Sequence, residues 1–437
     1  MYLDSIAKRN PALIRAGVML HQSGAIPANT YVIDLDTVRR NAEGMVKEAK
    51  RVGISLYFMS KHFNRNPLVA HTIVAAGIPA AVAVDVQDAQ YLHRFHVPIG
   101  HVGHLVQIPK HSLKSVLTMR PEVMTIFSVE KARQVSDAAT QLGIVQDILL
   151  RVRGKGDIIY PNEEGGIWEH DLEAAAQTIA QLKGVCIVGV VTFPATGYNP
   201  KTKQQEAAPN FATIRRAAER LTQLGFEIKQ VNAPASSCTV GFEVVARNGG
   251  THAEPGHALV GTTPSVLYDD NAPERPAMIY VSEVSHLFEG KGYVFGGGFY
   301  ACDTTANVGD DTDFHALTPW VCRAFLGRSP DDIFDTKVPV DVGSFFGRTI
   351  NATDYYGGTL CPDGPANIQV GDTAIYGFRA QVFTTRSQVA VVDSLDSTPR
   401  LLGLFDRSNN LLDDMGAPLE DSTRRVQELL RSVVKPV

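Results

Sequence analysis

Short apolar runs alternate with amphipathic segments between residues 31 and 261. In the amphipathic segments, apolar residues recur every three or four positions, as over 129–142 and 211–221, and this spacing predicts helices. The apolar runs predict buried strands: YVIDL, SLYFM, AAVAV, HLVQI, VMTIF, ILLRV, CIVGVVTF, IKQVN and HALVG. Strands that are apolar throughout and alternate with helices indicate a parallel sheet covered by helices.

The number of strands indicates how this sheet closes. Counted from SLYFM, eight strands precede the end of the rhythm, and eight strands close a (β/α)8 TIM barrel. An open doubly wound sheet is the alternative. No glycine-rich G-x-G-x-x-G turn follows the first strand to support it.

The pattern changes after about residue 265 and predicts a second domain. The runs MIYVSEV, GYVFGGGF, KVPVDV, GRTINA, DTAIYGF and QVAVV are separated by Gly and Asp turns, which is typical of antiparallel strands. A helical insertion is expected near HALTPWVCRAFLG, and a terminal helix in STRRVQELLRSVV. We therefore expect a helical segment over 1–28, which could pack on either domain, a barrel over 29–265 and a β domain over 266–437.

Composition narrows the classes of partner. The 437 residues are 44% hydrophobic and carry a net charge of −5, so nucleic acid or an anionic membrane is not expected as a partner. The five cysteines are scattered with no C-x-x-C pair, which argues against disulfides and structural zinc and fits the cytoplasm. The N-terminus lacks the apolar core of a signal peptide, and no apolar run has the length of a membrane span.

Polar residues at predicted strand ends are candidates for chemistry. Lys61 follows the run LYFM at the end of the first barrel strand, where active sites of such barrels collect. An ammonium walled by apolar residues has a lowered pKa, as a Schiff-base lysine requires. The alternative is a lysine that reaches to solvent from a strand edge.

Three further strand ends carry candidate residues. Ser236 and Ser237, in VNAPASSCTVG, could present hydroxyl and N–H groups to a phosphate, or form an ordinary small-residue loop. Glu254, in HAEPGHALVG, would need a cationic or hydrogen-bonding partner if buried. Phe193 could lie flat against a planar cofactor, or simply pack in the core.

The order of these motifs resembles the fold-type III pyridoxal-phosphate (PLP) enzymes, the superfamily of alanine racemase and the ornithine and diaminopimelate decarboxylases. YVIDLDTVRRNAEGM is similar to the opening strand and helix of that family, and VNAPASSCT to its phosphate loop. AEPGHALVGTTP combines the racemases' R-P-G-x-x-L-Y-G-x-x-P pattern with the decarboxylases' E-P-G-R. Within the superfamily, the chain resembles the bacterial YhfX-like proteins in particular.

This resemblance implies PLP as cofactor and gives roles to the candidate residues. Lys61 would hold PLP as a Schiff base and act as one acid/base at Cα. Glu254 matches the decarboxylases' glutamate, which keeps the pyridine nitrogen protonated, and Phe193 stands where the family has a stacking histidine. The residues that would contact the phosphate are Thr196, Gly197, Ser236, Ser237, Gly256 and His257.

In the second domain, DYYGGTLCPDG resembles the decarboxylase loop that crosses a dimer interface into the partner's site. The resemblance therefore implies a homodimer with shared active sites. Cys361 would be the second proton donor, with Tyr355 and Tyr356 as rivals. No H-x-C or H-x-D pair occurs near the end of the chain, so the zinc of some relatives is not expected. Arg379 and Arg348 are candidates to bind the substrate carboxylate.

The function expected from these features is that of a PLP-dependent enzyme acting at Cα of an amino acid. Glu254 and the Cys361 loop favour decarboxylation, and the racemase-like barrel favours racemisation, which stays open as the alternative. A PLP-binding homeostasis protein without turnover is a third reading. The full second domain argues against it, because the single-domain relatives lack one.

Overall fold

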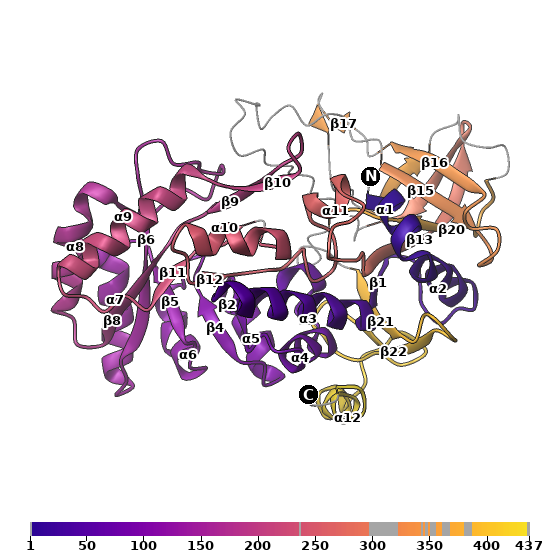
Figure 1. Ribbon diagram of the computed structural model, residues 1–437. Helices are drawn as coiled ribbons and strands as arrows, with labels where there is room; N and C mark the ends of the chain where they lie inside the picture. The colour runs from indigo at the N-terminus through magenta and orange to yellow at the C-terminus, as the bar shows by residue number, and fades with distance from the viewer. Residues whose placement is uncertain are drawn as a thin grey trace.

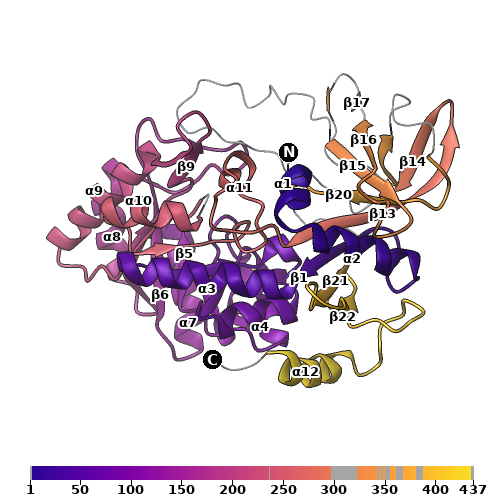
Figure 2. The same ribbon diagram turned by 45° about the vertical axis from the view of Figure 1, so that its right-hand side comes forward.

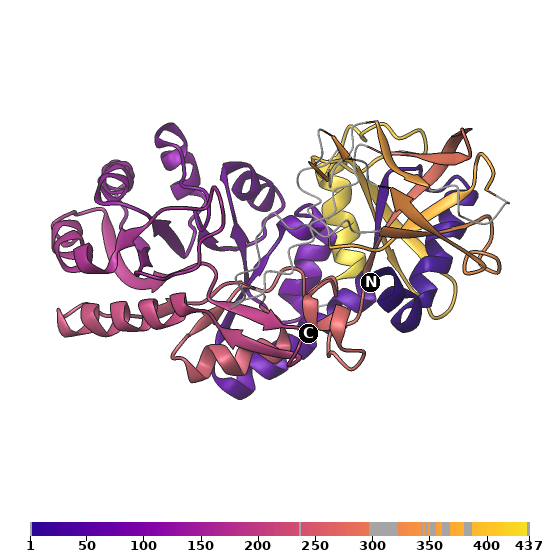
Figure 3. The same cartoon turned by 90° about the horizontal axis from the view of Figure 1, so that it is seen from above.

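The computed structural model divides into a helix-covered barrel and a β domain, which lie side by side (Figure 1). Seen from above, helices surround the barrel strands, and the N-terminal helices lie with the β domain (Figure 3). The structure describes residues 2–235, 237–296, 322–341, 344–345, 348–349, 355–360, 368–379 and 387–434.

Eight parallel strands form a closed barrel, which confirms the predicted (β/α)8 architecture. Each strand pairs in parallel with the next, and the last pairs with the first. In order around the ring they are β2 (Ser55–Met59), β3 (Ala80–Ala83), β4 (Ile99–Val102), β5 (Val123–Ile126), β6 (Gln146–Arg153), β8 (Val185–Val191), β11 (Gln230–Asn232) and β12 (His252–Ala253). A short strand, β7 (Ile167–Trp168), pairs with β6 outside the ring.

Eight helices cover the barrel, and α7 and α9 lie where the apolar spacing predicted helices. They are α3 (Leu35–Val52), α4 (Pro67–Ala75), α5 (Val86–Arg94), α6 (Leu113–Thr118), α7 (Val129–Gln141), α8 (Leu172–Ala180), α9 (Pro209–Gln223) and α10 (Phe242–Arg247). Between β8 and α9, β9 (Thr196–Asn199) and β10 (Gln204–Ala207) form a hairpin. The short α11 (Pro264–Tyr268) follows the last barrel strand.

Two of the predicted barrel strands were wrong in position. The run HLVQI is loop, and the strand of that unit is β4, which ends at Val102 before Gly103 at φ +77°. The run HALVG is a turn, and the strand of that unit is β12. Ala258, Leu259 and Val260 are apolar because the turn is buried, and burial alone does not distinguish a strand from a turn.

The β domain closes six strands into a ring and extends it with three more. The ring runs β13 (Met278–Phe288), β14 (Lys291–Phe295), β19 (Tyr356–Leu360), β16 (Thr336–Asp341), β15 (Cys322–Gly327) and β20 (Thr373–Tyr376). Beyond β13 lie β1 (Thr30–Asp34), β21 (Gln388–Asp393) and β22 (Arg400–Phe405). The run YVIDL therefore forms a strand of this sheet, between β13 and β21, and not of the barrel. A small hairpin pairs β17 (Ser344–Phe345) with β18 (Arg348–Thr349).

The helices at the two ends of the chain pack on different bodies (Figure 2). α2 (Pro11–Gln22) lies on β13 and β20 of the β domain, and α1 (Tyr2–Arg9) touches α11. The predicted terminal helix is α12 (Ser422–Val433), which packs on α4 of the barrel. The predicted helical insertion was wrong over 322–327, which is strand β15, and its residues 315–321 lie outside the described residues.

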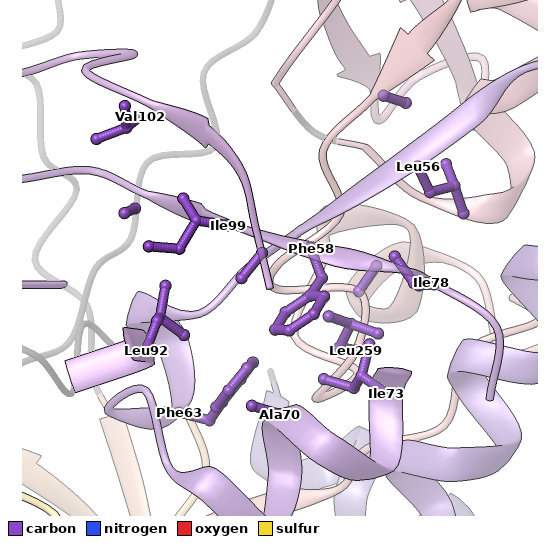
Figure 4. Packing of buried hydrophobic residues seen from close by; sticks show 14 of the residues in the cluster. Leu56, Phe58, Phe63, Ala70, Ile73, Ile78, Leu92, Ile99, Val102 and Leu259 are labelled. Atoms are coloured by element: carbon purple, nitrogen blue, oxygen red, sulfur yellow. The ribbon is translucent and has the colours of Figure 1, made fainter. Parts of the chain in front are cut away.

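Two apolar layers support the mouth of the barrel. Inside the ring, Tyr57 and Met59 of β2 pack with side chains of the facing strands. Outside it, Phe58 packs between the ring and α4, and its ring stacks on Phe63 at 6.3 Å (Figure 4). Successive residues of β2 thus bury both faces of the strand. Within the described part of the chain, no helix has the length and apolarity to cross a bilayer.

Candidate active site

Lys61 lies where β2 leaves the barrel. The strand ends at Met59, and Lys61 opens a single 3-10 turn, η1 (Lys61–Phe63). Asn66 caps α4 by accepting hydrogen bonds from Leu68 N and Val69 N, and Pro67 is the first residue of the helix. Phe63 anchors the turn in the apolar layer, so Lys61 is held at the barrel mouth, partly buried.

Glu254 follows β12 and lies in the interior of the mouth. Its side chain is fully buried, and its Oε1 lies 2.6 Å from His101 Nδ1 and accepts a bond of 2.9 Å from Asn232 Nδ2. Burial alone would raise the pKa of Glu254, but the imidazole and these two hydrogen bonds outweigh it and lower the pKa to about 2. Glu254 is therefore an ionised carboxylate, and the partner that the sequence analysis required for it is His101.

Two histidines of the mouth were missed in the sequence, His101 on β4 and His104 just after it. Each lies near Glu254, and the two imidazole rings are 5.3 Å apart. Burial lowers the pKa of His104 to about 3, and the charge of Lys61 contributes in the same direction. His104 is thus neutral, and neither of its ring nitrogens has a hydrogen-bond partner among the described residues.

Phe193 and a long loop complete the mouth. The ring of Phe193 meets His104 and Tyr160 edge-on, each at 5.5 Å. Tyr160 belongs to the loop between β6 and β7, which Asn210 of α9 holds by bonds to the backbone N–H and C=O of Ile158. This loop therefore covers the site beside Phe193.

Arg151 of β6 is a third residue that the sequence analysis missed. Its guanidinium is buried, lies over the ring of Phe127 at 4.9 Å, and donates from Nη2 to the Glu163 carbonyl at 2.8 Å. Burial lowers the pKa of Arg151 to about 10, so it stays charged at neutral pH. Its Nη1 has no acceptor among the residues that the structure describes.

The turn after Glu254 is built for close approach. A Cβ on Gly256 would lie 2.4 Å from His62 Cδ2 and 2.9 Å from Met59 Cβ, so only glycine fits there. The His62 ring packs against His257, with centroids 3.5 Å apart and the planes tilted by 30°. His257 Nδ1 lies 3.1 Å from Thr262 Oγ1, whereas its buried Nε2 has no partner in the described chain.

The predicted phosphate residues lie around this turn. Ser237 Oγ accepts a bond from the backbone N–H of Glu254 at 3.2 Å, which ties its loop to β12. Ser236 lies outside the described residues. Thr196 and Gly197 begin strand β9. The Thr196 hydroxyl donates to the Ala235 carbonyl and accepts from Gln205, so its side chain serves to hold the loop.

The β domain contributes one described cation to the mouth. Arg379 follows β20. The pKa of His257 is lowered mainly by burial and next by the positive charge of Arg379, so the guanidinium lies near that ring. Tyr355 and Tyr356 are exposed at the start of β19. Cys361 and the side chain of Arg348 lie outside the described residues, so their roles stay predictions.

The donor set fits a pyridine ring with an acidic N–H. Glu254 Oε2 is a buried carboxylate oxygen with no partner among the described residues, and it needs a donor. Lys61, the Gly256 turn and Phe193 lie around the same mouth. The site can therefore hold PLP, with Glu254 at the ring nitrogen. The observation that supports this fit is Oε2 of Glu254, which lacks a donor among the described residues.

Comparison with known proteins agrees with this architecture. The model "Alanine racemase, N-terminal domain" matches residues 33–264, and "YhfX-like, C-terminal domain" matches residues 279–317 and 344–401. Uncharacterized protein YhfX of Escherichia coli (strain K12) is 33% identical over 413 residues, which cover 94% of this chain and all of that protein.

Solved structures share the fold at low sequence identity. D-threonine aldolase from Filomicrobium marinum superposes with a TM-score of 0.61 at 15% identity, covering 88% of this chain and 96% of that one. D-threo-3-hydroxyaspartate dehydratase from Delftia sp. HT23 gives 0.60 at 17%, covering 86% and 97%. An alanine racemase of Clostridium difficile 630 gives 0.58 at 14%, covering 87% and 99%.

The fold and the matches define the class as the alanine racemase-like, fold-type III proteins, whose homologues use PLP. Within this class, the chain belongs to the YhfX-like family.

Proposed function

We propose that this protein is a PLP-dependent enzyme that acts at Cα of an amino acid, with decarboxylation favoured. The observation that carries the proposal is Glu254. It is fully buried and ionised, and its Oε2 has no hydrogen-bond partner among the described residues. A buried carboxylate oxygen without a donor is costly, so the site suits a ligand that supplies one.

PLP, when bound, supplies an electron sink that stabilises negative charge at Cα of an amino acid. Glu254 accepts the hydrogen bond of the ring N–H through Oε2 and keeps the proton on that nitrogen, because a nearby negative charge favours the cation. A protonated ring is the deeper sink. Lys61, at the end of β2, anchors the cofactor and moves the proton at Cα.

The surroundings fit a small anionic substrate. Lys61, Arg379 and Arg151 bring three cationic side chains toward the mouth, and a carboxylate suits the planar guanidinium of arginine. The ring of Tyr160, in the loop after β6, packs edge-on against Phe193 at the mouth. We assign Arg379 to the substrate carboxylate, because it enters from the β domain on the side of His257.

A second candidate is amino-acid racemisation. It is favoured by the match of the barrel to the alanine racemase N-terminal domain. The names of the structural relatives span a racemase, an aldolase and a dehydratase on one fold, so the fold does not fix the bond that breaks. Glu254, in place of the racemases' arginine, is the reason that decarboxylation stands first.

The proposal includes a homodimer with shared sites. Exposed apolar and aromatic side chains occur on β13 and β14 and at the start of β19, and exposed apolar surface of this kind suits an interface. They are Leu287, Phe288, Phe295, Tyr355 and Tyr356. In this arrangement Cys361 or Tyr356 of one protomer supplies the second acid/base to its partner's site.

A screen of L- and D-amino acids, which follows chiral inversion and CO2 release together, tests the proposal. Release of CO2 from one amino acid, abolished in Lys61→Ala, is the expected result. Inversion without CO2 would replace decarboxylation by racemisation. Bound PLP with no turnover of any amino acid would mean a PLP-binding protein without catalysis, and absence of bound PLP would refute the proposal.

A further inference from the structure

Three buried side chains form a hydrogen-bonded chain across the barrel mouth. The Oγ1 atom of Thr125, on β5, lies 2.5 Å from Nε2 of His101, on β4. Nδ1 of the same histidine lies 2.6 Å from Oε1 of Glu254, which follows β12. All three are buried, so water does not compete for these bonds. The chain starts on the neighbouring strands β4 and β5 and crosses the mouth to the end of β12, which pairs with neither of them. It ends at the carboxylate that faces the ligand.

The two carboxylate oxygens of Glu254 differ in their hydrogen bonds. Oε1 receives both His101 and Asn232, whereas Oε2 is buried with no partner in the described chain. Two donors on one oxygen fix the rotation of the carboxylate. As a result, Oε2 is held in one direction as a desolvated acceptor, and a ligand that offers N–H gains a charge-assisted bond there.

The charge of Glu254 determines which group donates in its hydrogen bond with His101. Glu254 is ionised and can only accept, so His101 carries a proton on Nδ1 and donates it. The Thr125 hydroxyl can then donate to Nε2 and hold this tautomer. With His101 donating to it, the carboxylate is a weak base and does not take the proton of its ligand. Without His101, burial would make Glu254 a stronger base.

The same residues could hold a metal ion, since one ligand atom from each of His101, His104 and Glu254 lies within 4.8 Å of the others. The geometry argues against it. Two ligands of one tetrahedral zinc lie roughly 3.3 Å apart, whereas His101 Nδ1 and Glu254 Oε1 are at hydrogen-bond distance, 2.6 Å. Both nitrogens of His101 are already engaged.

We propose that His101 is a positioning residue, which holds Glu254 as an ionised carboxylate with Oε2 directed at the ring nitrogen of bound PLP, through the chain Thr125–His101–Glu254. This inference rests on the proposed function. It adds His101 as the residue that keeps Glu254 ionised and oriented toward the cofactor. It also explains why the short strand β4 carries a histidine in the barrel interior.

The test compares binding of PLP with binding of 1-deaza-PLP, in which a carbon replaces the ring nitrogen, to protein stripped of cofactor. Only PLP can donate to Oε2, so the wild type should prefer PLP by roughly 10-fold to 100-fold. In His101→Leu this preference should fall by roughly 10-fold. A purely structural role would weaken both ligands equally and leave the ratio unchanged.

Two milder variants and a control sharpen the result. His101→Asn keeps an N–H near the position of Nδ1 and should retain most of the preference. Thr125→Val removes only the hydroxyl that bonds to His101 Nε2, and it should lower the preference for PLP less than His101→Leu does. This variant provides the test if His101→Leu does not fold. His71 lies on α4, and its Nε2 bonds to the backbone carbonyl of Phe95. His71→Leu loses this bond and should leave the preference for PLP over 1-deaza-PLP at the wild-type value.

The outcomes separate the inference from the proposed function. If the wild type binds neither ligand, the proposed function fails. If it prefers PLP and the ratio survives in His101→Leu and Thr125→Val, the positioning role is refuted while the function stands. Stoichiometric metal in the purified wild type that disappears in His101→Leu would also overturn the inference, because the group would then be a metal centre.

Discussion

Replacing Glu254 by glutamine removes one negative charge from the centre of the barrel mouth at nearly constant shape. The variant keeps an oxygen for Asn232 and His101, but it turns Oε2 into an N–H₂ group that points at the ligand. Two effects should follow, one on the empty protein and one on the cofactor.

The effect on stability can be worked from the carboxylate. Its pKa is lowered from 4.5 to about 2, a difference that corresponds to about 3 kcal/mol of stabilisation by the ionised form. Because the folded pKa is the lower one, this contribution is complete above pH 4.5 and is lost as the pH falls toward 2. Glu254→Gln without cofactor should thus unfold more easily by about 3 kcal/mol at pH 7, and the difference should shrink below pH 4.5.

The effect on the cofactor concerns the ring proton. A charge-assisted bond between Glu254 and the pyridine nitrogen is lost, so turnover should fall by roughly 10-fold to 1000-fold, at 1.36 kcal/mol per decade. PLP should still attach to Lys61, because the lysine and the Gly256 turn remain.

Denaturant unfolding at pH 7 and pH 3.5, together with the absorbance of bound PLP and the rate of turnover, measures both effects. Glu122→Gln is the matched control: its carboxylate bonds to Tyr57 Oη just before β5, at the opposite end of the barrel. The control should change stability and leave the PLP spectrum as in the wild type. Wild-type stability and turnover in Glu254→Gln with PLP bound would refute the reasoning, and the preference for decarboxylation with it.

Two further predictions concern the turn and the dimer. Gly256→Ala should cost about 1–3 kcal/mol and weaken PLP binding, because its Cβ would lie 2.4 Å from the packed ring of His62. Gly44→Ala, in an open position on α3, should be neutral or stabilising in the same unfolding and PLP titrations, and equal behaviour of the two variants would contradict this. Mixing Lys61→Ala chains with Cys361→Ala chains should restore activity, since one intact site forms in each heterodimer. No recovery in heterodimers verified by mass spectrometry would rule out shared sites.

The fold could be predicted well because its signals are local. Strand and helix alternate with a spacing that each segment displays by itself, and the cap at Asn66 with Pro67 gives the start of α4 directly. The place of β1 could not be predicted in this way. A strand buried on both faces looks the same in either sheet, and only its pairing with β13 and β21, far along the chain, decides.

The candidate site was visible where a polar residue interrupts an apolar run. Lys61 follows the apolar run LYFM at a strand end, and Glu254 lies just before the apolar run ALV. The structure places both at one mouth. Arg151 could have been found by the same signal, since a guanidinium inside ILLRV must have partners when the strand is buried.

His101 and His104 gave no such signal. The four residues of β4 include Gly100, which is required because the Tyr57 ring occupies the space of its Cβ, and glycine weakens the strand pattern. The more apolar loop after it therefore looked like the strand, and this shift removed His101 from the barrel interior.

The central claim is that Lys61 holds PLP at the mouth of this barrel. Borohydride reduction of the purified protein, followed by peptide mapping with mass spectrometry, tests it directly. The account predicts a pyridoxyl group on the peptide that contains Lys61, and its loss in Lys61→Ala. A label on Lys110 or Lys155 instead, or no label at all in protein supplied with PLP, would contradict it.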